Sequence, residues 1–239
     1  MKHHSKEKKI SPSSIILFGI LVIVIAIVWA LHKPPQVAPT LSAGPTNQIG
    51  PPGVSIDQVK TAGEPFIGNP DAPVTIAYWY DYQSVFCKQD EENVVPEIVQ
   101  NYVTAGKVKI VFKDFASIGP DSETLAIVAR AVFDVAPDKF YDWHKAIFAV
   151  QGKENSGWAT KSEVMSVTAQ VLGADATTQV SSLITSRLTI YENEIAADKT
   201  EGESLGTGGT PSMVIGNQLF VGPKPYRVVA SSLDGILGL

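Results

Sequence analysis

Residues 74–88 read VTIAYWYDYQSVFCK, a run that changes from a strand pattern to a helix pattern near its middle. Its first part, 74–80, is rich in β-branched and aromatic side chains, which predicts a buried strand. Apolar residues then recur at helical spacing over 85–104, where Pro96 is expected to bend the helix. The alternating run KVKIVF at 107–112 predicts a second strand. A strand, a helix and a strand in this order predict a parallel pair with a right-handed crossover.

The chain downstream of this unit first turns helical and then returns to strands. Residues 121–205 show no convincing strand pattern and hold several amphipathic helical stretches. Two short apolar runs at 212–216 and 218–222 flank Asn217 as in a hairpin, and YRVVASSLDGIL closes the chain as a helix. The complete order is βαβ, a helical block, then ββα. We therefore expect an α/β thioredoxin fold with an inserted helical subdomain at about 121–205.

The N-terminal part has the composition of a membrane anchor. Residues 15–31 carry no charge, and seventeen residues is the short end of the roughly 17–25 that span a bilayer as a helix. The preceding segment, 1–14, holds four lysines and one glutamate, which favours a cytoplasmic location for that end. A cleaved signal peptide is the alternative, since Val28-Trp29-Ala30 has small residues that a signal peptidase tolerates. Both interpretations place the remainder outside the cytoplasm, in the first case on a single-pass protein of the cell membrane.

A proline-rich segment separates this anchor from the folded part. Residues 32–54 contain six prolines, which oppose both helix formation and strand pairing. We expect a semi-extended tether there, with order beginning near Val54 and the folded domain occupying 55–239.

The charge of the chain argues against one class of partner. Five of the 19 lysines and arginines, but only one of the 24 acidic residues, lie in the first 33 positions. The rest of the chain therefore has 14 basic and 23 acidic side chains, a net charge of −9. An acidic surface of this kind is not expected to bind nucleic acid.

Three separated motifs resemble one family of exported proteins. GNPDAPVTI at 68–76 leads into the YDYQSVFCK segment at 80–88; KFYDWH follows at 139–144, and GTGGTPS at 206–212. In this order they resemble the DsbA-like family of bacterial thiol-disulfide oxidoreductases, which includes DsbA and BdbD, over about residues 64–236. The resemblance implies a thioredoxin fold, activity on thiols or disulfides of exported client proteins, and a redox partner protein.

The resemblance also identifies a departure at the site. The family has two cysteines at the positions of Ser84 and Cys87, with a proline where this chain has Val85. The first cysteine forms a thiolate at a helix N-terminus, and the second resolves the mixed disulfide. Cys87 is the only cysteine in the chain, so it cannot form an internal disulfide. Any activity is therefore expected to be degenerate, with one thiol.

Each candidate site residue has a functional and a structural interpretation. Cys87 is either a thiol that forms mixed disulfides or a small buried core residue. Ser84 is either the vestige of the nucleophile or a plain helix N-cap. The resemblance places Phe86, Thr210 and Pro211 on the client-binding side, with Pro211 expected to follow a cis peptide bond and Thr210 to supply backbone groups for the client.

Three functions remain open from the sequence. The first is a DsbA-like oxidoreductase with Cys87 as its only redox-capable group. The second is a non-redox chaperone or client-binding module, and the third is a glutathione-transferase-like enzyme that uses Ser84, as kappa-class transferases do. His3, His4 and His32 show no metal-ligand spacing, so we expect neither a metal nor a cofactor.

Overall fold

A mixed five-stranded sheet lies at the centre of the fold, in a computed structural model that describes residues 53–239. Its strand order is β1-β3-β2-β4-β5. The predicted anchor at 15–31 and nearly all of the predicted tether lie outside the described residues. Within 53–239, none of the helices is long and apolar enough to cross a membrane. The elements are η1 (Ile56–Gln58), β1 (Phe66–Ile67), β2 (Val74–Tyr80), α2 (Val85–Asn93), α3 (Val95–Ile98), η2 (Val99–Val103), β3 (Val108–Asp114), α4 (Pro120–Val135), η3 (Pro137–Lys139), α5 (Phe140–Ala149), α6 (Lys161–Leu172), α7 (Ala174–Leu205), β4 (Ser212–Ile215), β5 (Gln218–Val221) and α8 (Tyr226–Leu237).

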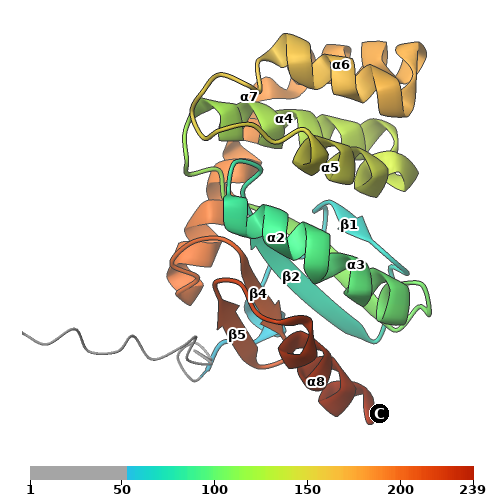
Figure 1. Cartoon of the computed structure of the whole chain (residues 1–239), viewed down its shortest axis with the longest axis vertical. Helices are drawn as coiled ribbons and strands as arrows, with labels where there is room; N and C mark the ends of the chain where they lie inside the picture. Colours follow the sequence, from blue (N-terminus) through green and yellow to red (C-terminus); the bar gives the residue numbers. More distant parts are fainter. Residues whose placement is uncertain (1–52) are drawn as a thin grey trace, which may run out of the picture. The chain divides into compact units, whose positions relative to one another are not determined.

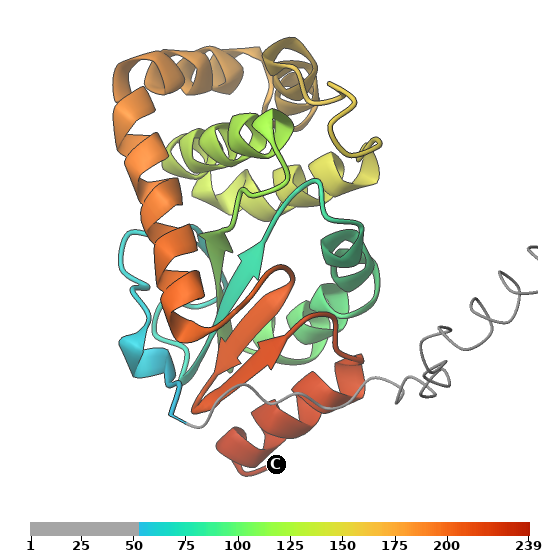
Figure 2. The same ribbon diagram turned by 90° about the vertical axis from the view of Figure 1, so that its left-hand side faces the viewer.

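Helices cover both faces of the sheet. Figures 1 and 2 show α2 and α3 on one face and the C-terminal part of α7 on the other, with α4, α5 and α6 gathered at one end. The inserted helical subdomain is thus α4 to α7, as predicted, and the sheet and its flanking helices form the thioredoxin fold. Because α7 has 32 residues, one helix connects the insertion with the sheet.

The strand predictions are confirmed with small changes of length. β2 and β3 pair in parallel from Val74 opposite Val108 to Tyr80 opposite Asp114, so β3 continues two residues past the predicted end at 112. β4 and β5 form the predicted hairpin. The two-residue edge strand β1 was not predicted, since so short a run has no readable alternation.

The predicted helix over 85–104 is three helical segments. α2 ends at Asn93, and α3 follows after Val94, with Pro96 in its first turn. A proline at that place removes no helical hydrogen bond of α3, but it cannot donate back into the preceding helix. The break therefore falls where Pro96 requires it, and the last turns wind as the π-helix η2.

Order near Val54, the last residue of the predicted tether, comes from contacts with the sheet. Val54 is 7% exposed and packs in a small apolar cluster with Trp79. The Trp79 ring also contacts α7, where its Nε1 donates to the carbonyl oxygen of Asp198 at 2.9 Å. A Cβ at Gly202 would lie 2.7 Å from the same nitrogen, so only glycine permits this approach of α7 to the sheet.

Buried charges join β3, α4 and α7. Arg130 donates from Nε to Asp114 at 2.7 Å and from Nη2 to Glu64 at 2.9 Å and to Asp198 at 2.5 Å. Lys113 has no exposed side-chain surface and pairs with Asp198 and Glu64. Burial lowers the pKa of Lys113, but the carboxylates around it outweigh burial and hold its pKa above the usual value. The charges compensate one another, which buried ions require.

Candidate functional site

Ser84 begins the helix that carries the candidate thiol. It is the N-cap of α2 in an extended conformation, and its Oγ accepts a hydrogen bond from the backbone N–H of Cys87 at 3.3 Å. Serine is favoured at this place because its hydroxyl satisfies a donor that the helix leaves unpaired. The Ser84 residue is only 4% exposed. The structural interpretation of Ser84 as an N-cap is therefore confirmed.

Cys87 lies one turn into α2 and faces inward. It is free and has no exposed surface. Burial raises the pKa of the thiol to about 12, although a backbone group of Asp81 and the hydroxyls of Thr210 and Ser84 oppose the rise. At neutral pH Cys87 is a protonated thiol, which is a poor nucleophile. As folded, Cys87 is a shielded core residue.

The loop before β4 closes the site from the opposite side. The Thr210–Pro211 peptide bond is cis. Ser212 fixes the loop, because its Oγ donates to the carbonyl oxygen of Gly209 at 2.8 Å. The Thr210 side chain lies close enough to the Cys87 sulfur to favour its thiolate. The fold thus brings Thr210 to Ser84 and Cys87, which lie more than 120 positions earlier in the sequence.

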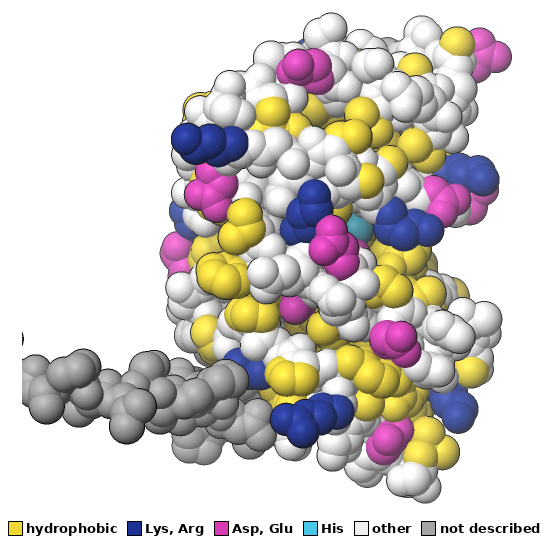
Figure 3. Space-filling model, viewed as in Figure 1, with side chains coloured by type: hydrophobic (Ala, Val, Ile, Leu, Met, Phe, Trp, Pro, Cys, Tyr) yellow, Lys and Arg dark blue, Asp and Glu magenta, His cyan; other side chains and the backbone are white. Residues whose placement is uncertain are grey.

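Phe86 points away from this group. Its side chain is 51% exposed, and that of Val85 is 49% exposed. Figure 3 shows hydrophobic side chains over the start of α2 and between α5 and α6 on one face of the molecule. Exposed apolar residues that gather beside a candidate site are typical of a surface that binds another polypeptide. Phe86, which the resemblance assigns to the client-binding side, is thus exposed beside the start of α2.

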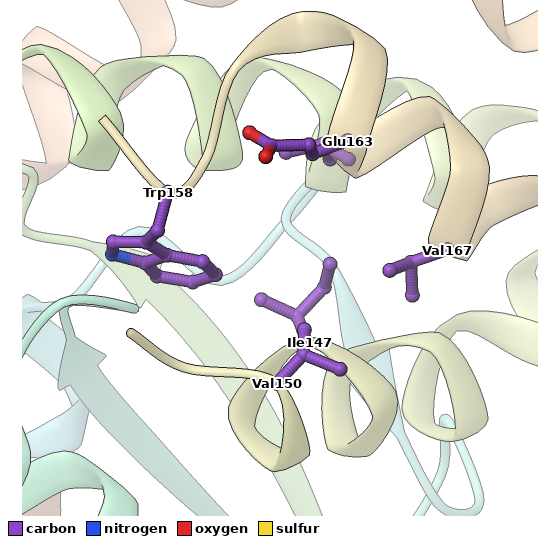
Figure 4. A pocket seen from close by; sticks show the side chains of 6 residues that line it. Ile147, Val150, Trp158, Glu163 and Val167 are labelled. Carbon is purple, nitrogen blue, oxygen red and sulfur yellow. The ribbon is translucent and has the colours of Figure 1, made fainter. Parts of the chain in front are cut away.

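A cavity between α5 and α6 lies close to the start of α2. It has a volume of about 320 Å³ and is lined mainly by apolar side chains. Figure 4 shows Trp158 in the connecting loop, facing Ile147 and Val150 at the end of α5 and Val167 on α6. Val150 is 53% exposed and adjoins Gln151, whose side chain contacts the turn before α2. This cavity could not be predicted from the sequence, because its walls come from segments without a motif.

The turn from β2 into α2 is held by polar side chains on all sides. Asp81 accepts hydrogen bonds from the backbone of Gln83 at 2.9 Å and from the Ser122 hydroxyl at 2.7 Å. The Gln83 side chain donates to Ser122 at 2.9 Å and accepts from the backbone N–H of Asn155 at 2.7 Å. Gln151 donates from Nε2 to the carbonyl oxygen of Ser84 at 3.1 Å. The helical insertion therefore fixes the start of α2.

His144 belongs to a second buried polar group beneath α2. Its Nδ1 lies 2.9 Å from the Tyr82 hydroxyl, and its Nε2 lies 3.0 Å from a carboxylate oxygen of Glu91. The His144 side chain is fully buried, so these two polar contacts take the place of solvent. The KFYDWH motif marked its segment, but the partners on α2 and in the turn could not be read from the sequence.

A buried carboxyl group lies further along α2. Asp90 is 3% exposed, and burial with the nearby Glu91 raises its pKa to about 7, while Lys224 opposes the rise. The Tyr78 hydroxyl lies near Cys87 and these two carboxyl groups, and burial first of all holds its pKa well above the usual value. Across residues 53–239, no three or more His, Cys, Asp or Glu side chains are arranged to hold a metal ion.

Known proteins resemble this chain in sequence and in fold. A family model described as Thioredoxin matches residues 60–234. The disulfide bond formation protein D of Bacillus subtilis is 24% identical over 182 residues, 74% of this chain and 78% of that protein. A probable disulfide bond formation protein D of Bacillus cereus is 25% identical and covers 64% and 70%.

Two solved structures share the fold. The oxidised BdbD of Bacillus subtilis superposes with a TM-score of 0.69 at 22% identity and covers 79% of this chain and all of its own. The thiol-disulfide exchange protein α-DsbA2 of Wolbachia pipientis superposes with a TM-score of 0.65 at 24% identity, covering 75% and 90%. At these identities the structural likeness establishes the fold, including the helical insertion.

Proposed function

The chain belongs to the DsbA-like family of thioredoxin-fold thiol-disulfide oxidoreductases, and we propose that it acts outside the cytoplasm on thiols or disulfides of exported polypeptides. The observation that carries this proposal is the meeting of Ser84, Cys87 and the cis Thr210–Pro211 loop at the start of α2. The family's chemistry takes place between these positions. The relatives' name, disulfide bond formation protein, supports the same class of substrate.

One thiol restricts the chemistry that this site can perform. A Cys87 thiolate can attack a client disulfide, which forms a mixed disulfide and releases one client thiolate. A second thiol, from the client or from a small molecule, must then attack to free Cys87. The sequence of steps exchanges disulfides without net oxidation, because one sulfur cannot store a disulfide. We therefore propose a monothiol exchange activity.

Binding without exchange is the second candidate. The burial of Cys87 and its pKa of about 12 favour it, since neither permits rapid attack. The exposed Val85, Phe86 and Val150 and the cavity beside Trp158 offer apolar contacts for an extended client, and the loop at Thr210 offers backbone groups. In this case the protein is a chaperone or client-binding module that retains the family scaffold.

No observation favours the glutathione-transferase alternative. The Ser84 oxygen already accepts the N–H of Cys87, and the residue is nearly inaccessible. A cosubstrate thiol would have to displace this cap to reach the hydroxyl.

The membrane location is part of the proposal. Residues 15–31 would anchor the protein in the cell membrane, with the N-terminus in the cytoplasm and the folded domain outside. The proposed partners are exported client polypeptides and a redox partner protein, which would supply the second thiol of the exchange cycle.

The test uses the full chain in detergent and a peptide that carries one activated disulfide. We expect the wild type to bind the peptide and to form a mixed disulfide slowly, and Cys87→Ala to bind equally without a covalent product. Catalysed oxidation of a reduced two-cysteine peptide over many turnovers, without added thiol, would contradict the monothiol proposal. Binding by both variants with no covalent product would identify the second candidate, and no binding would refute both.

A further inference from the structure

The turn Asp81–Ser84 forms part of the shell around the buried Cys87 sulfur. A backbone group of Asp81 lies close enough to the thiol to influence its ionisation, and the Ser84 hydroxyl accepts the N–H of Cys87. Since Cys87 has no exposed surface, a reagent reaches the sulfur only when part of this shell moves. Movement of the turn is therefore one way to expose the thiol, and movement of the loop at Thr210 is another.

Gln151 holds this turn from the helical insertion. Its Nε2 donates to two carbonyl oxygens, that of Tyr82 at 2.6 Å and that of Ser84 at 3.1 Å. The Ser84 carbonyl also accepts the N–H of Lys88 at 3.1 Å, which is the first helical hydrogen bond of α2. One side chain thus ties two residues of the turn, and with Ser84 the start of α2, to the segment that follows α5.

The bonds of Gln151 differ from the other contacts of the turn. Asp81 and Gln83 bond through their own side chains, whereas Gln151 reaches the turn's backbone from a segment 67 or more positions away. An isolated loss of Gln151 leaves the turn's own side-chain bonds intact. Those bonds still join Asp81 and Gln83 to Ser122 and Asn155 of the insertion. The part of the turn that gains freedom is therefore its Tyr82–Ser84 end, while the sheet and the core of α2 stay folded.

We propose that Gln151 is a positioning residue that sets how often the turn Asp81–Ser84 opens, and that Cys87 reacts through this local opening rather than through global unfolding. In the open state Cys87 gives its proton to solvent and attacks a disulfide. One sulfur–sulfur bond forms, and the other sulfur leaves as a thiolate with the electron pair of the broken bond. Only the extension to client disulfides rests on the proposed function.

The test measures the reaction of Cys87 in the full chain with an aromatic disulfide reagent whose released thiolate absorbs visible light. The rate is followed at urea concentrations below the unfolding transition. For wild type we expect a slow rate that depends weakly on urea, as local opening exposes little surface. Gln151→Ala removes two hydrogen bonds and should raise the rate roughly tenfold or more.

Two further variants separate bonding from packing and from stability. Gln151→Glu keeps the size of the side chain but has no N–H donor, so it should react at least as fast as Gln151→Ala. Gln218→Ala removes an amide that bonds Ser232 far from the turn. The rate at which Cys87 reacts in this variant should stay within about twofold of wild type, after correction for any change in the free energy of unfolding. A Gln151→Glu rate equal to wild type would overturn the proposal.

A wild-type rate that follows urea as steeply as global unfolding would also overturn it. The reagent contains no polypeptide, so this result would leave client binding untouched. Conversely, a chain that binds no client could still show the Gln151 effect, and the two proposals fail separately.

Discussion

At the residue scale, a hydroxyl stands in the first turn of α2 where an ionised thiol would be stabilised. The unpaired N–H groups and the helix dipole at this place favour negative charge. Ser84 uses one of these N–H groups as a cap and remains neutral. Cys87 carries the sulfur one turn later, where burial keeps it protonated. The helix therefore offers its electrostatic support at one position and its thiol at another.

Replacing Ser84 by cysteine should place a thiol where the helix N-terminus stabilises negative charge. We expect Ser84→Cys to form a disulfide with Cys87, since the Ser84 hydroxyl already lies close enough to the Cys87 thiol to influence its ionisation. The new thiol should have a pKa below the roughly 8.5 of a free cysteine, measurable from the ultraviolet absorbance of the thiolate. The double variant with Val85→Pro restores one more family residue and should oxidise reduced peptides, whereas wild type should not. A double variant whose thiols never pair under strong oxidant would show that the site is misassigned.

Asp90 should make stability depend on pH. Its pKa is raised to about 7 in the folded state from an ordinary 3.8, so the folded chain binds more protons than the unfolded chain between these values. Its contribution to stability therefore grows as the pH falls from about 7 to about 4. Asp90→Asn should raise the free energy of unfolding at pH 8 by on the order of 2 kcal/mol and flatten this dependence. Urea unfolding at several pH values measures both effects; an unchanged slope would refute the assignment.

At the scale of elements, the sequence predicted those parts whose pattern is local. The strand at 74–80, the hairpin and the last helix (226–237) follow from periodicity, and the structure has them within two residues. The break between α2 and α3 at Val94 depends on where Pro96 falls within a helical turn, and the spacing of apolar residues does not reveal that position. The single helix α7 could not be foreseen at its full length, because its apolar face changes partners from the insertion to the sheet.

The contact of α7 with the sheet gives a test with an internal control. Gly202→Ala places a methyl group 2.7 Å from the Nε1 of Trp79 and should lower the free energy of unfolding by about 1–3 kcal/mol. Gly235→Ala, in α8, meets no atom within 4 Å and should raise it by about 0.5–1 kcal/mol. Urea unfolding of both variants measures whether the free energy of unfolding falls at Gly202 and rises at Gly235. Equal effects at the two positions would mean that α7 does not approach Trp79 as described.

At the scale of the whole molecule, the site depends on contacts that cross the chain. The motifs located Ser84, Cys87 and Thr210, because short runs around them resemble the family. The motifs did not reveal Gln151 or the pair of His144 with Glu91, since these partners lie more than 50 positions apart and carry no signature of their own. The sequence therefore indicated residues that the fold brings together at the start of α2, but not the residues that hold them there.

The anchor is the remaining prediction, and it lies outside the described residues. Residues 15–31 are uncharged and follow a lysine-rich end, so the full chain should stay in the membrane fraction after alkaline washing. Ile23→Lys places a charge at the centre of the run, at a cost of roughly 2.5–3.5 kcal/mol for insertion, and should release part of the protein. Ile23→Val is the matched control and should behave as wild type. Protease added to intact cells should digest the folded domain while the first residues stay protected. A mature chain that starts beyond Ala30 and is free in the medium would instead establish a cleaved signal peptide, because a chain cut there has lost the run that would hold it in the bilayer.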